Sequence, residues 1–575
     1  MVKQTPKPQK PKTYHLNPES AEKKLKAIFK LSDQPERTTI FTKYTYASVK
    51  SLHPLLKTSL EKSNFTRITK IQLKSYPTIN KREDCIVKSQ TGSGKTLAYL
   101  VPLLNQLMKA QPKIKREDGT KLLIICPTRE LCLQINNTLL KVGKACVHIV
   151  SGLLIGGESI KKEKEKLRKG LNIIIATPGR VKYHLEHTST FSLDSLDNIV
   201  LEECDRTLDM GFSREINYII EKLQDRLFRV QKVLVSACIT EKVENLLEQL
   251  SIPIESDVKM IGFDKSNVQR LDLPETLNHF YLTLDERVKV IYFLMTVKIL
   301  EKVKSVIFVA TADEANYFEA LLKFARDEFF RIYKQTSEQF YSGYIGKIHG
   351  YVEQKDRSEV FNNFVKAKNG CLITTDVGSR GLNFENISVI VLFDVSQSYK
   401  DYVNRVGRTA RIENIGSALS FLTPAEQNYA EKLKANCKAE ELKRYNIEDI
   451  FKGLLDEKGN GHFDSLNNMI KQFVASDDNQ YLARRAFNSF CRAYTMLKDK
   501  DCFQLKNMNL HSISKSFGLD SSASKRKGVA EKTSELKDSK NFMASKMSES
   551  DKRASQMKAA IKRMQNKNHE VSEFM

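Results

Sequence analysis

Short apolar runs, each ended by polar or turn residues, recur through the first half of the chain. They are "DCIVKS", "LLIIC", "NIIIATP", "NIVLEE" and "KVLVSAC", and charged amphipathic segments such as "SIKKEKEKLRK" lie between them. Apolar strands that alternate with helices are typical of a parallel sheet covered on both faces. This half of the sequence therefore predicts an α/β domain.

The same pattern stops around "SIPIESDVKMIGFDKSNVQRLDLPE" and restarts with "SVIFVA", "GKIHG", "GCLITTD" and "SVIVLFD". Beyond residue 445 helical spacing takes over, and in "RRAFNSFCRAYTML" the side chains of Phe487, Phe490 and Tyr494 share one helix face. We expect that stripe to pack in a core, with RNA stacking as the alternative. The predicted organisation is a basic, disordered N-terminal segment over 1–44, a first α/β domain over 45–255, a linker over 256–274, a second α/β domain over 275–445, a helical extension over 446–520 and a basic, disordered tail over 521–575.

Composition indicates a polyanionic partner. The chain has 575 residues, 93 Lys and Arg against 69 Asp and Glu, and a formal net charge of +24. Such an excess favours nucleic acid, although a general bias towards Lys is the alternative. The ten cysteines form no C-x-x-C pair, which argues against a zinc ribbon or a redox motif. Since no run approaches the ~18 apolar residues that span a bilayer, we expect a soluble, intracellular protein with no membrane partner.

The segment "SQTGSGKT" carries the most specific chemistry. It lies between the predicted strand "DCIV" and the predicted helix "LAYLVPLLNQL". Backbone N–H groups of such a loop hold phosphates, Lys95 would reach the β- and γ-phosphates, and Thr96 would hold Mg²⁺. Ser89 stands at the first glycine position of the strict pattern. The residues predicted to bind ATP here are Ser89, Gln90, Thr91, Gly92, Ser93, Gly94, Lys95 and Thr96.

The stretch "LEECD" places carboxylates at the end of a strand that should be buried. A second strand tip beside a phosphate-binding loop is where Mg²⁺ and the attacking water need acidic groups. We therefore expect Glu202 to face the metal, Glu203 to orient the water and Asp205 to tie into the rest of the site. The alternative is a solvated acidic turn.

The order of these and further motifs resembles that of the DEAD-box RNA helicases of superfamily two. The motifs are "TKIQ", "SQTGSGKT", "PTREL", "GG", "TPGR", "EECD", "SAC", "IFV", "HG..EQ..R", "TTDVGSRGLN" and "NRVGRTAR", over about residues 45 to 430. The resemblance implies a particular α/β fold, in which two tandem RecA-like domains close on ATP and RNA.

The resemblance also implies roles for individual residues. Tyr46, Phe65 and Gln72 match the adenine-recognition motif, and Asn383 matches a nucleotide-site position. Arg408 and Arg411 match the two arginine fingers. The implied catalytic residues are Lys95, Glu203, Arg408 and Arg411. The positions that match RNA-facing motifs are Pro127, Thr128, Arg129, Glu130, Gly157, Thr177, Pro178, Gly179, Arg180, His349, Gly350, Gln354, Arg357, Thr375, Asp376 and Arg380.

Several motifs depart from the family pattern. The usual D-E-A-D is Glu202-Glu203-Cys204-Asp205, the usual S-A-T is Ser236-Ala237-Cys238, and an Asp and a His are replaced by Asn383 and Asn404. In the family, that His and the Thr of S-A-T belong to the contact that links nucleotide state to RNA opening. The residues expected to serve this coupling are Asp205, Ser236, Cys238 and Asn404.

The C-terminal segments "ARRAFNSFCRAY" and "LHSISKSFGL" resemble an extension found in the nucleolar, ribosome-biogenesis branch of the family. The resemblance implies a monomeric RNA helicase or RNA-remodelling ATPase that uses ATP and Mg²⁺. Its partners would be pre-rRNA of the large subunit and pre-ribosomal assembly proteins, and its place the nucleolus within the nucleus. Two alternatives remain at this point: an ATP-dependent RNA clamp or assembly scaffold with little hydrolysis, and a DNA translocase.

Overall fold

A computed structural model describes most of the chain. The described residues are 40–88, 93–252, 259–263, 271–274, 276–332, 340–378, 384, 386–410, 415–437, 439, 442–446, 451 and 463–519. Residues 1–39 of the predicted N-terminal segment and the whole predicted tail lie outside them. So do the predicted site residues Ser89, Gln90, Thr91, Gly92, Arg380, Asn383 and Arg411.

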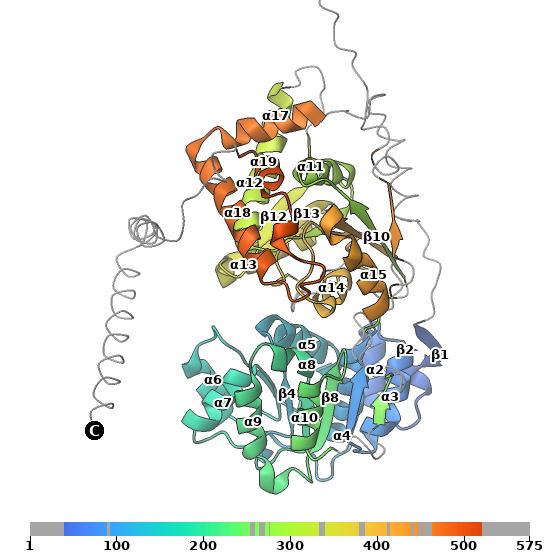
Figure 1. The fold of residues 1–575 in the computed structure, drawn as a ribbon. Coiled ribbons are helices and arrows are strands. Elements are labelled where there is room, and N and C mark those ends of the chain that lie inside the picture. The colour runs from blue at the N-terminus through green and yellow to red at the C-terminus, as the bar shows by residue number, and fades with distance from the viewer. Residues whose placement is uncertain are drawn as a thin grey trace, which may run out of the picture. The chain divides into compact units, whose positions relative to one another are not determined.

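The first domain is built on a seven-stranded sheet in the order β5-β6-β4-β7-β8-β3-β9, and every neighbouring pair of strands is parallel. Figure 1 shows its helices on both faces of the sheet. The strands are β3 (Cys85–Lys88), β4 (Leu122–Ile125), β5 (Ser151–Leu154), β6 (Ile173–Ala176), β7 (Asn198–Leu201), β8 (Gln231–Ser236) and β9 (Lys259–Ile261). The helices are α2 (Pro54–Lys62), α3 (Lys70–Asn80), α4 (Lys95–Met108), α5 (Arg129–Val142), α6 (Ile160–Arg168), α7 (Pro178–His187), α8 (Cys204–Asp209), α9 (Ser213–Glu221) and α10 (Glu241–Gln249).

The alternation of side chains along each strand explains why this sheet is covered twice. In β4, Leu122 and Ile124 enter the core on one face, whereas Leu123 and Ile125 enter the core on the other. Because both faces are dry, the strands read as continuous apolar runs rather than as alternating ones. Charged residues stand only near the ends of these strands: Lys232 and Lys259 near the starts of β8 and β9, and Lys88 at the end of β3. The acids of the candidate site come just after β7 has ended, at the carboxyl edge of the sheet.

The second domain repeats this plan with the strand order β12-β13-β11-β14-β15-β10-β16, again parallel throughout. Its strands are β10 (Leu277–Thr283), β11 (Lys304–Phe308), β12 (Tyr344–Ile348), β13 (Gly370–Thr374), β14 (Val389–Leu392), β15 (Gly416–Leu422) and β16 (Lys443–Arg444). Its helices are α11 (Lys289–Ile299), α12 (Ala312–Ile332), α13 (Gln354–Lys366), α14 (Tyr399–Val406) and α15 (Gln427–Asn436).

The C-terminal extension forms α17 (Phe463–Val474), α18 (Asp477–Thr495) and α19 (Leu510–Ser516). Figure 1 shows these helices against the second domain, where α18 packs along α12. The aromatic stripe of α18, Phe487, Phe490 and Tyr494, is buried, as the core-packing interpretation predicted. The Tyr317 hydroxyl also donates to the carbonyl of Phe517 over 3.1 Å, so the extension and the second domain share one core.

The two tandem parallel sheets confirm the predicted fold class. The elements differ from the sequence prediction in two places. Strand β9 pairs with β3 and so extends the first sheet into the segment expected to be a linker. A separate antiparallel pair, β1 (Phe41–Thr45) with β2 (Arg67–Thr69), begins before residue 45. Within the described residues, no helix has the length and apolar character needed to span a membrane.

Candidate active site and nucleic-acid interface

The described end of the phosphate-binding loop leads directly into α4. Gly94 has φ +85°, a left-handed conformation that favours glycine, and a Cβ there would lie 2.6 Å from Gln72 Nε2. Helix α4 begins at Lys95, so Lys95 and Thr96 lie in its first turn. A helix N-terminus that follows such a loop can present backbone N–H groups to an anion, and the motif predicts that this anion is a phosphate.

Gln72 is tied to this loop. It is 5% exposed, its Oε1 accepts the backbone N–H of Thr69 over 2.9 Å, and its Nε2 donates to the carbonyl of Gly94 over 3.0 Å. The first bond belongs to the capping box that begins α3. The second joins α3 to the phosphate-binding loop. Of its predicted companions, Phe65 is half-buried, whereas Tyr46 lies inside the core of the first domain at 3% exposure.

Replacing Gln72 with Ala should weaken ATP binding and reduce the preference for ATP over GTP. The change removes an amide that is held beside the loop and could pair with an adenine edge. Gln72→Glu is the matched variant, because it keeps an acceptor for the Thr69 N–H but loses the donor to Gly94. Dissociation constants for ATP and GTP would be measured on all three proteins. An unchanged ATP-to-GTP ratio in both variants would remove Gln72 from the nucleotide site.

The predicted carboxylates lie together at the tip of β7. Glu202 follows the strand directly and is 2% exposed. Burial raises the pKa of Glu202 to about 7, against the opposing charge of Lys95. One of its oxygens, Oε2, has no hydrogen-bond partner among the described residues. A buried carboxylate oxygen beside the first turn of α4 calls for a cation, so this feature fits the predicted Mg²⁺ position.

Glu203 differs from Glu202 in its environment. It has φ 47°, an uncommon left-handed conformation for a residue other than glycine, and stands at the start of α8. Burial would raise the pKa of Glu203, but Arg206, Lys95 and Arg408 together lower it below its ordinary value. Its Oε2 accepts from Arg206 over 3.0 Å. The carboxylate is thus charged and can accept a proton or a hydrogen bond from water.

The second domain contributes α14 and the residues just after it. Arg408, which is 7% exposed, follows the end of α14 and acts on the pKa of both Lys95 and Glu203. Arg405, which is 1% exposed, donates from Nε to Asp376 over 2.7 Å and from Nη1 to the carbonyl of Asp394 over 3.0 Å. These bonds join α14 to the segments that follow β13 and β14.

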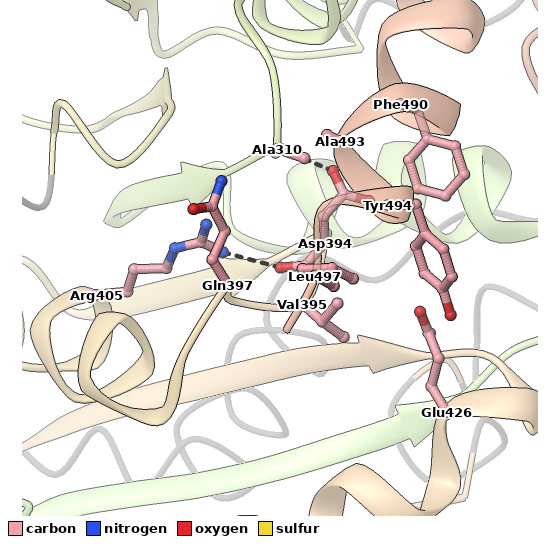
Figure 2. Close-up of a pocket in the computed structure, with 10 residues that line it drawn as sticks. All are labelled: Ala310, Asp394, Val395, Gln397, Arg405, Glu426, Phe490, Ala493, Tyr494 and Leu497. Atoms are coloured by element: carbon pink, nitrogen blue, oxygen red, sulfur yellow. Dashed lines mark hydrogen bonds between the residues drawn. The ribbon is translucent and has the colours of Figure 1, made fainter. Parts of the chain in front are cut away.

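A small pocket behind α14 links this network to the extension (Figure 2). Arg405 and Asp394 line it on one side, while Glu426 and Tyr494 point towards each other on the other. Asp394 also accepts from the backbone N–H of Ala310 over 3.0 Å and pairs with Lys289 at 3.2 Å. Burial raises the pKa of Glu426, with Lys289 opposing it. Helix α18 therefore covers the charged network that holds α14, which we call the arginine helix because Arg405 lies in it and Arg408 follows it.

The residues expected to couple the domains are only partly brought together. Ser236 donates to the carbonyl of Cys238 over 2.6 Å, and Cys238 Sγ lies 4.0 Å from Asp205 Oδ2. The side chain of Asn404 forms no hydrogen bond within the part of the chain that the structure describes. Instead, Lys400 Nζ lies 2.7 Å from Asp205 Oδ2 and 2.8 Å from Asp209 Oδ2.

The RNA-facing positions of the first domain lie at the ends of β4, β5 and β6. Thr128 caps α5, accepting the Leu131 N–H, and Thr177 precedes α7, whose first residues are Pro178 and Gly179. A Cβ on Gly179 would meet no atom within 4 Å, so its backbone is open to a close approach. Helix N-termini of this kind suit phosphate groups. Pro127 comes directly before the Thr128 cap.

A buried ion pair supports the loop that follows β5 and contains Gly157. Glu163 accepts the N–H of Ile155 over 3.0 Å and lies 2.9 Å from His184 and 3.4 Å from Arg180 Nε. Arg180 in turn donates to the carbonyl of Ile155. The loop continues to Gly157, whose φ of +81° favours glycine and whose Cα lies beside the guanidinium of Arg129. Motif spacing did not reveal Glu163 or His184, because nothing in the sequence shows that they are buried.

In the second domain the predicted positions follow β12 and β13. His349 pairs with Asn316 over 3.1 Å, and Arg357 donates to the carbonyls of His349 and Gly350. Thr375 follows β13 just before Asp376. Two second-domain residues also meet the first domain: Gln354 Nε2 lies 3.5 Å, and Arg357 Nη1 3.6 Å, from Glu130 Oε1. The structure thus brings together positions of both domains that were predicted to face RNA.

The two parallel sheets, with the predicted phosphate-binding loop before α4 and the carboxylates at the tip of β7, are the arrangement expected of a two-domain P-loop ATPase. Residues 69–246 match the DEAD/DEAH box helicase family, and residues 273–413 match the helicase conserved C-terminal domain. Residues 476–522 match the C-terminal extension of the ATP-dependent rRNA helicase SPB4-like family.

Curated relatives agree with these matches. DEAD-box ATP-dependent RNA helicase 17 of Oryza sativa is 31% identical over 556 residues, covering 85% of this chain and 92% of the relative. ATP-dependent RNA helicase dbp4 of Schizosaccharomyces pombe is 32% identical and ATP-dependent DNA helicase DDX31 of Homo sapiens is 31% identical; the matches cover 80% and 84% of this chain but only 58% and 62% of those proteins. The chain belongs to the DEAD-box ATP-dependent RNA helicases.

Solved structures support the fold. Mss116p bound to ssRNA and AMP-PNP superposes with a TM-score of 0.68 at 22% identity, covering 84% of this chain and 92% of Mss116p. S. cerevisiae Dbp5 bound to RNA and ADP BeF3 gives a TM-score of 0.54 at 22% identity, covering 70% of this chain and 98% of Dbp5.

Proposed function

We propose that this helicase remodels pre-rRNA during large-subunit assembly in the nucleolus, as a monomer that works among pre-ribosomal assembly proteins. The observation that carries this proposal is the match of residues 476–522 to the extension of an rRNA helicase family. In this chain that segment forms α18 and α19 and is packed into the core of the second domain. The extension is therefore a built part of the enzyme rather than an appended tail.

The site supports ATP hydrolysis by positioning and charge. Lys95, at the start of α4, would hold the β- and γ-phosphates, and Arg408 would stabilise the charge that develops on the γ-phosphate. Glu203, kept ionised beside Arg206, would orient the attacking water and accept its proton. The Thr96 hydroxyl and the Glu202 carboxylate would hold Mg²⁺, which would neutralise phosphate charge when bound.

The RNA side of the site supports contacts with the backbone more than with bases. The helix N-termini that follow Thr128 and Thr177 offer N–H groups, and the open glycines Gly179 and Gly350 permit a close approach. Such contacts carry little sequence information. Selection of one RNA would then fall to the extension and to other parts of the chain.

Cross-linking in cells would test the proposed substrate. The tagged, full-length chain would be cross-linked to RNA, and the bound RNA sequenced beside that of the Lys95→Ala variant. We expect enrichment of large-subunit pre-rRNA, with a changed distribution in the variant because its ATP cycle is blocked. Enrichment of small-subunit pre-rRNA or of mRNA would contradict the large-subunit assignment.

A clamp or assembly scaffold is the second candidate, and the altered coupling residues favour it. Cys238 and Asn404 replace the family's Thr and His, and the Asn404 side chain makes no hydrogen bond within the described residues. Against it stands the presence of Lys95, Glu203 and Arg408 in mutual electrostatic range. The human relative named as a DNA helicase also makes single-stranded DNA a necessary comparison in any activity assay.

A further inference from the structure

Lys400 bridges the two ATP-binding domains. It lies in the first turn of α14, in the second domain, whereas its two partners, Asp205 and Asp209, belong to α8 in the first domain. The Nζ atom is 2.7 Å from Asp205 Oδ2 and 2.8 Å from Asp209 Oδ2, and the side chain is 18% exposed. Asp205 is 3% exposed and Asp209 49%, so burial limits solvent screening of the Lys400–Asp205 contact more than that of the Lys400–Asp209 contact.

The charge of this bridge is secure. Burial would lower the pKa of Lys400, but the charges and hydrogen bonds of Asp205 and Asp209 raise it above its ordinary value. Burial would likewise raise the pKa of Asp209, but Lys400 and Lys242 lower it. Lys242 belongs to α10 of the first domain and lies 3.5 Å from Asp209 Oδ1. The carboxylate therefore has one lysine from each domain.

Both ends of the bridge are attached to reacting groups. Asp205 stands two residues after Glu203. On the other side, α14 leads to Arg408 and is held at one end by the extension and at the other by the second domain. The neighbouring Tyr399 donates to Asp499 of the extension over 2.8 Å, and Arg405 donates to Asp376 over 2.7 Å. A helix held in this way moves as one piece, so a bond at Lys400 fixes where Arg408 lies relative to Glu203.

Asn404 and Cys238, which were expected to link the two domains, make weak side-chain contacts or none within the described residues. Asn404 lies four residues after Lys400, so the two share one face of α14. Asn404 makes no side-chain hydrogen bond within the described residues, and Cys238 Sγ lies 4.0 Å from the same Asp205 oxygen that Lys400 contacts at 2.7 Å. The strong contact is thus one helical turn away from the position that the motif indicates.

We propose that Lys400 is a positioning residue that couples ATP binding to RNA binding, by joining Asp205 and Asp209 of the first domain to the arginine helix α14 of the second. In the family a Thr and a His link the two domains, and in this chain Cys238 and Asn404 replace them. Lys400 takes over this link. This inference rests on the proposed function, because it concerns the RNA-dependent ATP cycle.

The test measures coupling rather than activity alone. The dissociation constant for a single-stranded RNA would be determined with and without AMP-PNP and Mg²⁺, and their ratio gives the coupling factor. Four proteins would be compared with the wild type: Lys400→Ala, Lys400→Arg as the conservative rescue, Asp209→Asn as the change on the opposite side, and Lys242→Ala as the matched control. Lys242→Ala removes the same charge from beside Asp209 but breaks no contact between the domains.

We expect Lys400→Ala to lower the coupling factor by about tenfold, within the ordinary range for coupled sites, while ATP affinity without RNA stays within about twofold. Asp209→Asn should lower it less, and Lys400→Arg and Lys242→Ala should keep it. A coupling factor like that of the wild type in Lys400→Ala would overturn the proposal, as would an equal loss in Lys242→Ala. If Lys400→Ala does not fold, an undiminished factor in Asp209→Asn overturns it. A wild type without any coupling would instead contradict the proposed function itself.

Discussion

Glu203→Gln should cut RNA-stimulated ATP hydrolysis by about 10² or more, the usual contribution of a group that positions and deprotonates water, while ATP and RNA still bind. The structure gives the reason for the size of the effect. Arg206, Lys95 and Arg408 keep the pKa of this carboxyl low despite its burial, so it is a charged acceptor that an amide cannot replace. Single-turnover hydrolysis at saturating ATP and RNA would measure the chemical step.

The control for this change is Glu221→Gln, which alters an exposed glutamate on α9 of the same domain and should hydrolyse ATP at the wild-type rate. RNA residence times would be recorded beside turnover. Equal turnover in wild type and Glu203→Gln, with long-lived RNA complexes in both, would contradict the helicase hypothesis and favour the RNA-clamp hypothesis.

Lys95→Ala should weaken ATP binding by roughly 10²-fold, because a charge-assisted contact to phosphate of about 3 kcal/mol is removed. Lys95 is the first residue of α4. Burial lowers the pKa of Lys95, and the charges of Glu202 and Glu203 oppose this shift while Arg408 adds to it. Removing its charge leaves the two carboxylates without the cation from the loop. Fluorescent-nucleotide titration would measure the affinity, and thermal unfolding would confirm that the variant folds.

RNA affinity without nucleotide provides the internal control for Lys95→Ala. It should be unchanged, since the RNA-facing positions at Thr128 and Thr177 belong to other helices. An ATP affinity equal to that of the wild type would mean that "SQTGSGKT" is not the phosphate-binding loop.

The apolar runs predicted the inner strands well, because a parallel strand that is buried on both faces must consist almost entirely of apolar residues. The run "NIVLEE" predicted both the end of β7 and the carboxylates at its tip. Strand β5 was not among the predicted runs, because half of its sequence "SGLL" is Ser and Gly, which are typical of loops. Strand β10, "LNHFYLT", carries polar residues among its apolar ones, and β16 is only a pair of residues held by its register with β10.

The candidate site divides in the same way. Motif order located the loop, the strand-tip acids and the arginine helix, since each depends on residues close together in sequence. The contacts that join them could not be predicted, because they connect distant segments. Lys400 meets Asp205 from another domain, and Asp499 meets Tyr399 from the extension. A lysine on a charged helix has no local feature that separates such a bridge from an ordinary solvated side chain.

Steady-state ATP hydrolysis by the wild-type chain, with and without single-stranded RNA, tests the central claim most directly. Single-stranded DNA of the same sequence would be the matched control. We expect slow hydrolysis by the protein alone, a clear increase on addition of RNA, and little increase with DNA. Hydrolysis that stays at the basal rate with saturating RNA, although RNA binds, would contradict that claim.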